Sequence, residues 1–501
     1  MKIKFCGAAR NVTGSNHLLE ISGKKILLDC GLFQGGGRAK AALLNQELLY
    51  DPKDVDYLLL SHAHIDHAGR IPMLVKKGFR GKVFCTKATK ELANVLLQDS
   101  AHIQMQDAFY INKKFKGDKV EPLYKDVDVK KAMELFYTHE YTQKFKLDEG
   151  IWVTFYDAGH VLGSSIIVID YREDGEYQRL TFTGDLGQKY VPIVNDPYQV
   201  KESDILITES TYASHLHDSF SGVHDDLAMI INDLVARKGK IIVPGFSFER
   251  TQEFVYVLHE LINQKRIPQI PIFVDSPLST EISKVFDKFK EYYDEETFRT
   301  FVDKKQSPFY FEGIKYIKNV EHSKKLNQFD GSCIIISASG MCEAGRIKHH
   351  LKNHMSDPNN LILVIGFMAK GTRGRQIVEG KREIKIFGQR YPLKADVVIM
   401  NSFSAHADKL ELLDYVKNIQ NLKNVFVVHG EETECAVMRD NIYNVLKFKG
   451  RVDVPHQGEE YEVKGGETRS KLGLRRKKDY QELEELERRN DKKQIAKYKQ
   501  I

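Results

Sequence analysis

The chain has 501 residues, of which 42% are hydrophobic and 29% charged, a composition typical of a soluble globular protein of about three domains. No stretch approaches the roughly 20 apolar residues of a membrane span, and the N-terminus lacks the apolar core of a signal peptide. The net charge is +6, and residues 469–501 hold twelve Lys or Arg against six Asp or Glu, so the rest of the chain is close to neutral and lacks a broad basic field.

Residues 1–210 show short apolar or alternating segments with few helical stretches between them. Strands are predicted at 1–7, 25–29, 57–60, 82–86, 152–155, 165–170 and 179–183. Helices are predicted at 68–77 and 90–109.

Residues 211–395 change to an alternation of strand and helix. Strands are predicted at 240–244, 271–275, 333–337 and 361–365, and helices at 228–238, 251–264, 280–293 and 345–355. This order predicts a parallel sheet flanked by helices. After a strand at 396–400 the first pattern returns up to about 463, and the charged tail 464–501, with Leu483 and Leu486, is expected to form an exposed helix.

The most informative segment is Ser61–His67, directly after an apolar strand. Side chains two apart in extended backbone point the same way, so His62 and His64 can bind one metal ion. Asp66 and His67, where the chain turns into a helix, can face a second ion. Imidazole and carboxylate together favour zinc or a similar divalent ion, whereas packing does not explain four such side chains in one loop.

Two metal ions need more ligands than this loop supplies, and three later strand ends offer them. His160 lies between two glycines, Asp185 follows Gly184, and His429 ends another apolar strand. A carboxylate has two oxygens and can bridge two cations. Each residue alone is more often structural, but with the Ser61–His67 loop they complete two coordination shells.

These positions carry a resemblance to a known family. The ordered motifs that resemble the metallo-β-lactamase superfamily are Asp29, the 62–67 loop, His160 and Asp185. Segments 208–212, 404–408 and 428–431 are similar to the further motifs of its β-CASP branch of nucleic-acid-processing nucleases. The resemblance covers about residues 1–460 and is closest to prokaryotic RNA-processing members related to the endonuclease subunit of pre-mRNA 3′-end processing.

The resemblance implies an α/β fold, a metallo-β-lactamase αββα sandwich with an inserted β-CASP parallel α/β domain. The first part of the sandwich is expected at 1–210, the insertion at 211–395, the returning part at 396–463 and the charged tail at 464–501. Because His429 lies 244 positions beyond Asp185, the ligand pattern also indicates an insertion, with the catalytic cleft expected between the domains.

The resemblance also implies roles, beginning with two zinc ions and hydrolysis of an RNA phosphodiester by water activated between them. The implied ligands are His62, His64 and His160 for one zinc ion, Asp66, His67 and His429 for the other, and Asp185 as the bridge. Asp29 is expected to accept the N–H of a ligand imidazole. His406 is the candidate general acid for the leaving sugar oxygen, and Glu209 the carboxylate that orients it.

Phosphate binding is predicted for two glycine-containing loops that follow strands. The candidates are Ser339, Gly340, Arg346 and Arg373, and tight turns with solvated charges explain these loops equally well. The expected substrate is single-stranded RNA, with no membrane partner. The tail is expected to bind RNA or a protein partner, and a homodimer is compatible with the sequence.

The six cysteines are scattered without a C-x-x-C pair, which indicates a reducing cytoplasm. Three alternatives to a zinc ribonuclease stay open at this point. They are a small-molecule metallo-hydrolase of the thioesterase type, a DNA-processing nuclease, and a catalytically silent RNA-binding subunit. The sequence does not distinguish endonuclease from 5′-exonuclease activity.

Overall fold

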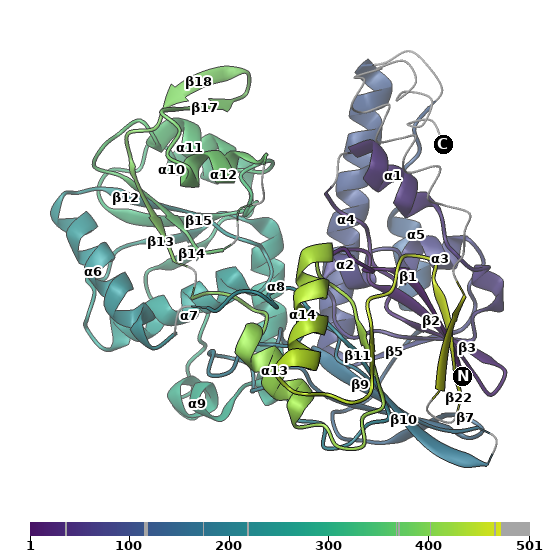
Figure 1. Cartoon of the computed structure of the whole chain (residues 1–501). Helices are drawn as coiled ribbons and strands as arrows, with labels where there is room; N and C mark the ends of the chain where they lie inside the picture. Colours follow the sequence, from purple (N-terminus) through teal and green to yellow (C-terminus); the bar gives the residue numbers. More distant parts are fainter. Residues whose placement is uncertain are drawn as a thin grey trace. The chain divides into compact units, whose positions relative to one another are not determined.

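The computed structural model describes residues 1–35, 38–114, 119–173, 175–217, 220–366, 368, 371–400, 402–464 and 467–471. The chain divides into two compact units (Figure 1). Unit 1 comprises Met1–Gly187, Pro197–Leu216 and His406–Ile501, and unit 2 comprises Gln188–Asp196 and His217–Ala405.

Unit 1 is built on two β-sheets. The eight-stranded sheet has the order β23 (Glu467–Lys471), β22 (Glu460–Lys464), β1 (Lys2–Gly7), β2 (Asn16–Ile21), β3 (Lys24–Leu28), β4 (Tyr57–Leu59), β5 (Lys82–Cys85) and β6 (Phe136–Thr138). The seven-stranded sheet has the order β21 (Arg451–Asp453), β20 (Asn424–Val427), β11 (Ile205–Thr208), β10 (Glu176–Phe182), β9 (Ser165–Glu173), β8 (Ile151–Asp157) and β7 (Phe145–Asp148).

The side chains of β9 show how the layers of unit 1 are held together. Ile167 and Ile169 lie in the core between the two sheets, with Phe5 of the facing sheet. Ile166 and Val168 point to the opposite face and pack in a second core with residues of α13 and α14. Successive side chains of a strand alternate between faces, so residues 166–169 of β9 form a continuous apolar run because both faces of the strand are covered there.

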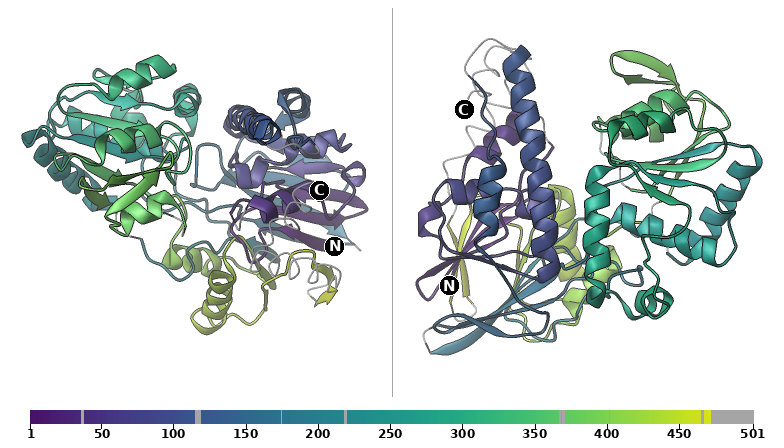
Figure 2. Two further views of the ribbon diagram at one scale, coloured as in Figure 1. Left: turned by 90° about the horizontal axis from the view of Figure 1, so that it is seen from above. Right: turned by 180° about the vertical axis from the view of Figure 1, so that it is seen from behind.

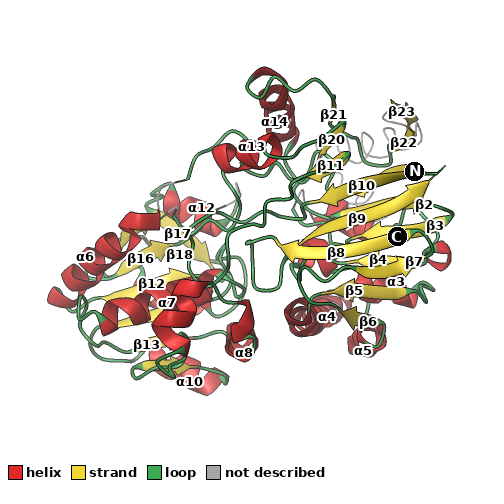
Figure 3. Cartoon of the chain, turned by 90° about the horizontal axis from the view of Figure 1, so that it is seen from below, coloured by secondary structure: helices red, strands yellow, loops and turns green. Residues whose placement is uncertain are grey.

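Helices cover both outer sides of this sandwich. They are α1 (Arg38–Gln46), α2 (Ile65–Ala68), α3 (Ile71–Lys76), α4 (Lys87–Lys114), α5 (Asp126–Met133), α13 (Lys409–Lys417) and α14 (Glu432–Asn444). Figure 3 shows α4 and α5 on one side of the sheets and α13 and α14 on the other. Among the described residues, no helix is both long and apolar enough to cross a membrane.

The prediction of a single helix at 68–77 is wrong, because the chain forms two helices, α2 and α3, with Gly69 and Arg70 between them. Pro72 lies in the first turn of α3. Proline has no N–H to donate to a preceding helical turn, so it is tolerated where a helix starts and breaks one that would continue through it.

Unit 2 contains a six-stranded sheet in which all paired strands are parallel. Its order is β14 (Ile314–Tyr316), β13 (Ile272–Val274), β15 (Cys333–Ser337), β12 (Lys240–Pro244), β16 (Leu361–Val364) and β19 (Asp396–Ile399). The helices are α6 (Val223–Ala236), α7 (Arg250–Asn263), α8 (Pro277–Lys288), α9 (Glu295–Thr297), α10 (Val320–Leu326), α11 (Ile347–His354) and α12 (Arg373–Val378).

A two-stranded hairpin, β17 (Glu383–Ile386) and β18 (Gln389–Pro392), projects from the body of unit 2 (Figure 2). Its Ile384 and Ile386 are fully buried in the core that also contains Ile347 and Leu351 of α11. The parallel sheet inserted into a two-sheet sandwich confirms the predicted fold class. In the tail, 467–471 form β23, and the helix predicted around Leu483 and Leu486 lies outside the described residues.

Candidate metal centre

The predicted metal ligands come together because three strands of unit 1 run in the same direction. Strands β10, β11 and β20 are parallel neighbours, with Phe182 opposite Ile207 and Thr208 opposite Val427. Their carboxyl ends therefore lie at one edge of the sheet. Glu209 follows the end of β11 directly, His429 lies two residues after the end of β20, and Asp185 lies three residues after the end of β10.

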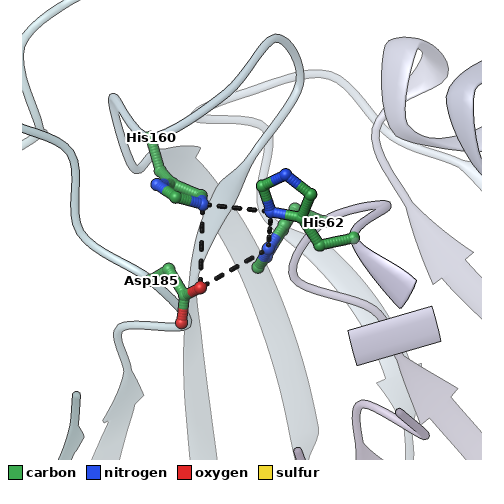
Figure 4. Close-up of side chains that lie close together, drawn as sticks. His62, His160 and Asp185 are labelled. Atoms are coloured by element: carbon green, nitrogen blue, oxygen red, sulfur yellow. Dashed lines mark hydrogen bonds and ion pairs between the residues drawn. The ribbon is translucent and has the colours of Figure 1, made fainter. Parts of the chain in front are cut away.

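The first group of ligand atoms consists of His62, His64, His160 and Asp185, all within 4.8 Å of one another. Nε2 of His62 and Nε2 of His160 each lie 3.6 Å from Oδ2 of Asp185. Nδ1 of His64 lies 3.0 Å from Nε2 of His62 and 3.2 Å from Nε2 of His160. Figure 4 shows the imidazoles of His62 and His160 directed toward the carboxylate of Asp185.

The second group consists of Asp66, His67 and His429, and it adjoins the first through Asp185. Nε2 of His67 lies 3.1 Å from Nε2 of His429 and 3.2 Å from Oδ2 of Asp185. Nε2 of His429 lies 3.6 Å from Oδ2 of Asp66, and its Nδ1 lies 3.6 Å from Oδ1 of Asp185. Asp185 thus reaches both groups with its two oxygens.

Two properties of these groups suit metal cations: one buried carboxylate oxygen has no hydrogen-bond donor in the described part of the chain, and two of the imidazoles are neutral. Asp185 is 2% exposed, and its Oδ1 accepts no hydrogen bond from the described residues. Buried carboxylate oxygens are otherwise paired, so a cation is the natural partner. Burial lowers the pKa of His64 to about 4, and burial together with nearby His67 lowers that of His62, so both imidazoles are neutral and have a lone pair for a metal.

Asp29 orients the imidazole of His67. Its Oδ2 accepts a hydrogen bond of 2.8 Å from Nδ1 of His67, and its Oδ1 accepts one of 2.8 Å from the backbone N–H of Ser61. With the proton of His67 held on Nδ1, Nε2 keeps its lone pair toward Asp185. Burial alone would lower the pKa of His67, but the effect of the carboxylates of Asp185 and Asp29 is larger and raises it. The two carboxylates therefore favour positive charge beside His67.

Glu209 and His406 form a third group with Asp185. Nδ1 of His406 lies 3.1 and 3.2 Å from the two carboxylate oxygens of Glu209. Glu209 is fully buried and also accepts a hydrogen bond of 2.7 Å from the backbone N–H of Leu186, whereas the side chain of His406 is 18% exposed. A buried carboxylate therefore holds an imidazole that reaches the surface beside the ligands.

Gly184 allows the chain to turn so that Asp185 enters this cluster. Its φ is +55°, and a Cβ at this position would lie 2.8 Å from Cβ of Ser61. Residues with a side chain rarely adopt this conformation, and here the space is also filled.

The four predicted phosphate-binding residues all lie in unit 2. Arg346 donates to Oδ1 of Asp275 at 2.7 Å and to two backbone carbonyls, while Arg373 donates to Oε2 of Glu343 at 2.8 Å and to backbone carbonyls. The fold thus uses much of the hydrogen-bonding capacity of both guanidinium groups. Phosphate binding by these arginines, and by Ser339 and Gly340, stays a prediction.

Two further residues contact these imidazoles, and neither was predicted from the sequence. The hydroxyl of Ser61 lies 3.0 Å from Oδ2 of Asp29 and 3.0 Å from Nδ1 of His62, and Oγ1 of Thr211 lies 3.2 Å from Nδ1 of His429. Each contacts the imidazole of a predicted metal ligand. Their signal in the sequence is their place inside the motifs, directly before His62 and two residues after Glu209.

Comparison with known proteins places these elements in families. Three family models match the chain: a metallo-beta-lactamase superfamily domain at 18–177, a Beta-Casp domain at 251–377, and a Zn-dependent metallo-hydrolase RNA specificity domain at 390–455. A crystal structure of a protein of unknown function from Enterococcus faecalis is similar with a TM-score of 0.53 at 14% identity, covering 92% of this chain and 99% of that one, which shows the fold alone.

Curated relatives match over most of the chain. Ribonuclease TTHA0252 of Thermus thermophilus is 35% identical over 438 residues, which cover 87% of this chain and 95% of that protein. Transcription termination factor FttA of Methanosarcina mazei is 29% identical over 463 residues, covering 90% and 70%. Cleavage and polyadenylation specificity factor 73 of Drosophila melanogaster is 28% identical over 443 residues, covering 88% and 61%. The chain therefore belongs to the β-CASP branch of the metallo-β-lactamase superfamily.

Proposed function

We propose that this protein is a zinc-dependent ribonuclease that hydrolyses phosphodiester bonds of single-stranded RNA. The observation that carries the proposal is the position of Asp185 in unit 1. It belongs to the first and the third group of side chains, and its oxygens lie 3.2 Å from His67 and 3.6 Å from His429 of the second group. Two of these groups have the composition of metal sites. The third, Glu209 with His406, has the composition of a proton donor and its orienting carboxylate.

His62, His64 and His160 would hold one zinc ion, and Asp66, His67 and His429 would hold the second, with Asp185 contacting both. When bound, such a pair of ions polarises the phosphate as a Lewis acid and lowers the pKa of the attacking water. Asp29 keeps His67 in the tautomer that binds a metal through Nε2.

His406 supplies the proton that the leaving sugar oxygen needs. Glu209 holds Nδ1 of His406, so Nε2 is the atom that donates. The buried carboxylate stabilises the protonated imidazole before transfer and fixes its plane.

The comparison with known proteins supports RNA as the substrate. One matching model describes an RNA specificity domain, and one relative is named a ribonuclease. Within the described residues all six cysteines are free thiols, which is consistent with the cytoplasmic location that we also propose.

The test is cleavage of 5′-labelled and internally labelled single-stranded RNA by the zinc-loaded protein. We expect zinc-dependent cleavage that a chelator abolishes, and the product sizes assign endonuclease or 5′-exonuclease activity. Parallel reactions contain single-stranded DNA of the same sequence and a simple thioester. Cleavage of RNA that persists in chelator would refute the mechanism, and turnover of the thioester or DNA in place of RNA would refute the substrate.

A further inference from the structure

The hairpin β17–β18 carries a feature that its own folding does not explain. Its strands pair Ile386 with Gln389, so the loop consists of Phe387 and Gly388 alone. Both have positive φ, +49° and +84°, as a type I′ turn requires. Asn or Asp followed by Gly is the favoured pair for this turn, whereas a bulky side chain in the first position is strained.

The strain at Phe387 is not offset by burial. Its side chain is 50% exposed, whereas Ile384 and Ile386 of the same strand are fully buried. The fold thus places a large aromatic ring in a conformation that disfavours it and leaves half of the ring in water. Backbone strain of this kind is retained mainly where it serves a ligand.

One cation and one imidazole lie against this ring. Nζ of Lys348 lies 4.5 Å from the ring centroid of Phe387, and the ring of His349 lies 4.6 Å from it, both from α11. Among the described residues, neither Lys348 nor Lys352 of the same helix forms an ion pair with any acidic side chain. The pKa of His349 is lowered, first by burial and then by the nearby His350, Lys352, Lys348 and Lys324. The lysine contributions are those of a locally positive potential.

The two strands of the hairpin add a like-charged pair. Lys385 lies directly opposite Arg390, two residues before and three residues after Phe387. Such a pair destabilises a hairpin, and Glu383, 3.5 Å from Arg390, offsets it in part. A strained exposed ring and facing cations are both explained by a ligand that combines flat apolar surfaces with negative charge.

We propose that Phe387, with Lys348, His349, Lys385 and Arg390, forms a binding site for single-stranded RNA, in which a base stacks on Phe387 and phosphates contact the cations. Stacking on an aromatic ring and cationic contacts to the backbone are how single strands bind without sequence preference. An acidic peptide offers the charge but lacks successive flat rings. The inference rests on the proposed ribonuclease function, and all five residues belong to unit 2, whereas the metal ligands belong to unit 1.

The test compares steady-state cleavage of a 20-nucleotide single-stranded RNA by the zinc-loaded full chain and its variants. Phe387→Asn should raise KM at least about fivefold with kcat retained, because one stacked base is lost. Phe387→Trp should keep the wild-type KM. Hydrolysis of bis(p-nitrophenyl) phosphate, which is too small to contact a second site, should not change in either variant.

Thermal unfolding separates this role from a structural one. Asn suits positive φ and precedes Gly well in this turn, so Phe387→Asn should match or exceed the wild-type Tm. Phe298→Ala is the matched control, since Phe298 is also an exposed phenylalanine of unit 2, and it should leave KM unchanged. Lys348→Gln should reduce the dependence of log KM on log salt concentration by about 0.7.

An unchanged KM in Phe387→Asn, or a marked fall in its Tm, would overturn the site while leaving the ribonuclease function intact. Competition by poly-glutamate as effective as by unlabelled RNA would assign the patch to acidic proteins instead. A wild-type protein that hydrolyses bis(p-nitrophenyl) phosphate but no RNA would overturn the proposed function and, with it, this inference.

Discussion

Replacing Asp29 by Asn tests the arrangement of the metal centre at one atom. Asp29 has φ of +58°, a conformation that Asn adopts at least as readily as Asp, so the backbone is not strained by the change. The amide oxygen can still accept the 2.8 Å hydrogen bond from the N–H of Ser61. The amide NH₂, however, replaces the oxygen that accepts from Nδ1 of His67 at 2.8 Å.

His67 can relieve this conflict by moving its proton from Nδ1 to Nε2. Nε2 is the nitrogen that lies 3.2 Å from Asp185 and 3.1 Å from His429, so the lone pair for the metal is lost. Removing such an orienting partner typically lowers metal affinity about 10- to 100-fold, equivalent to about 1.4–2.8 kcal/mol. The loss should be larger for the ion held by Asp66, His67 and His429, because Asp29 contacts His67 directly and reaches His62 only through the hydroxyl of Ser61.

The assay is zinc titration against a chromophoric chelator, with the bound zinc counted by elemental analysis. We expect the wild type to retain two ions and Asp29→Asn to retain one tightly. The control is Asp148→Asn, which removes a carboxylate that accepts from the hydroxyl of Tyr57 and no ligand imidazole. Equal weakening of both ions, or of neither, would refute the reasoning.

Three further predictions concern the proton donor, unit 2 and the turn before Asp185. His406→Ala should lower RNA turnover about 10²- to 10⁴-fold while elemental analysis still finds both zinc ions, and loss of one ion would identify His406 as a ligand instead. Burial raises the pKa of Asp275, but hydrogen bonds from His350, Ser323 and Arg346 outweigh it and hold that pKa below 3.8, so the stabilisation is present above pH 3.8 and lost as the pH falls. Urea unfolding of wild type and Asp275→Asn should therefore differ at neutral pH and converge in acid, and a constant difference would contradict this assignment. Gly184→Ala should destabilise the fold by more than the roughly 1–2 kcal/mol that its positive φ costs a residue with a side chain, because the new Cβ would also lie 2.8 Å from Cβ of Ser61, and it should lower the zinc content. Gly150→Ala, with φ of +71° and its nearest atom at 3.9 Å, should cost only about 1–2 kcal/mol and leave zinc unchanged.

Much of the fold could be predicted because the elements of unit 2 have strong local signals. The predicted strands 240–244 and 333–337 coincide with β12 and β15, and both are apolar runs that end at loop residues. The prediction of one helix at 68–77 failed on a local signal, because Pro72 within that segment starts a new helix and interrupts the hydrogen bonds of one that would continue through it.

The arginines of unit 2 show a limit of local patterns. Arg346 follows a glycine-containing loop, which is the pattern of a phosphate site. Its guanidinium nevertheless donates to Asp275, which lies 71 positions earlier and is fully buried. Sequence spacing carries no information about such a partner, because the two residues meet only when β13 and α11 pack in the folded sheet.

The sequence by itself determined the chemistry of the metal-binding loop, since His62, His64, Asp66 and His67 are close in the chain and their directions follow from backbone geometry. Only the tertiary structure decided which distant groups join them. Asp185, Glu209 and His429 meet because β10, β11 and β20 pair in parallel and in register, and that pairing depends on the burial of whole sheet faces rather than on any local segment. The same holds for Phe387, whose strain and exposure arise only once its hairpin closes against α11.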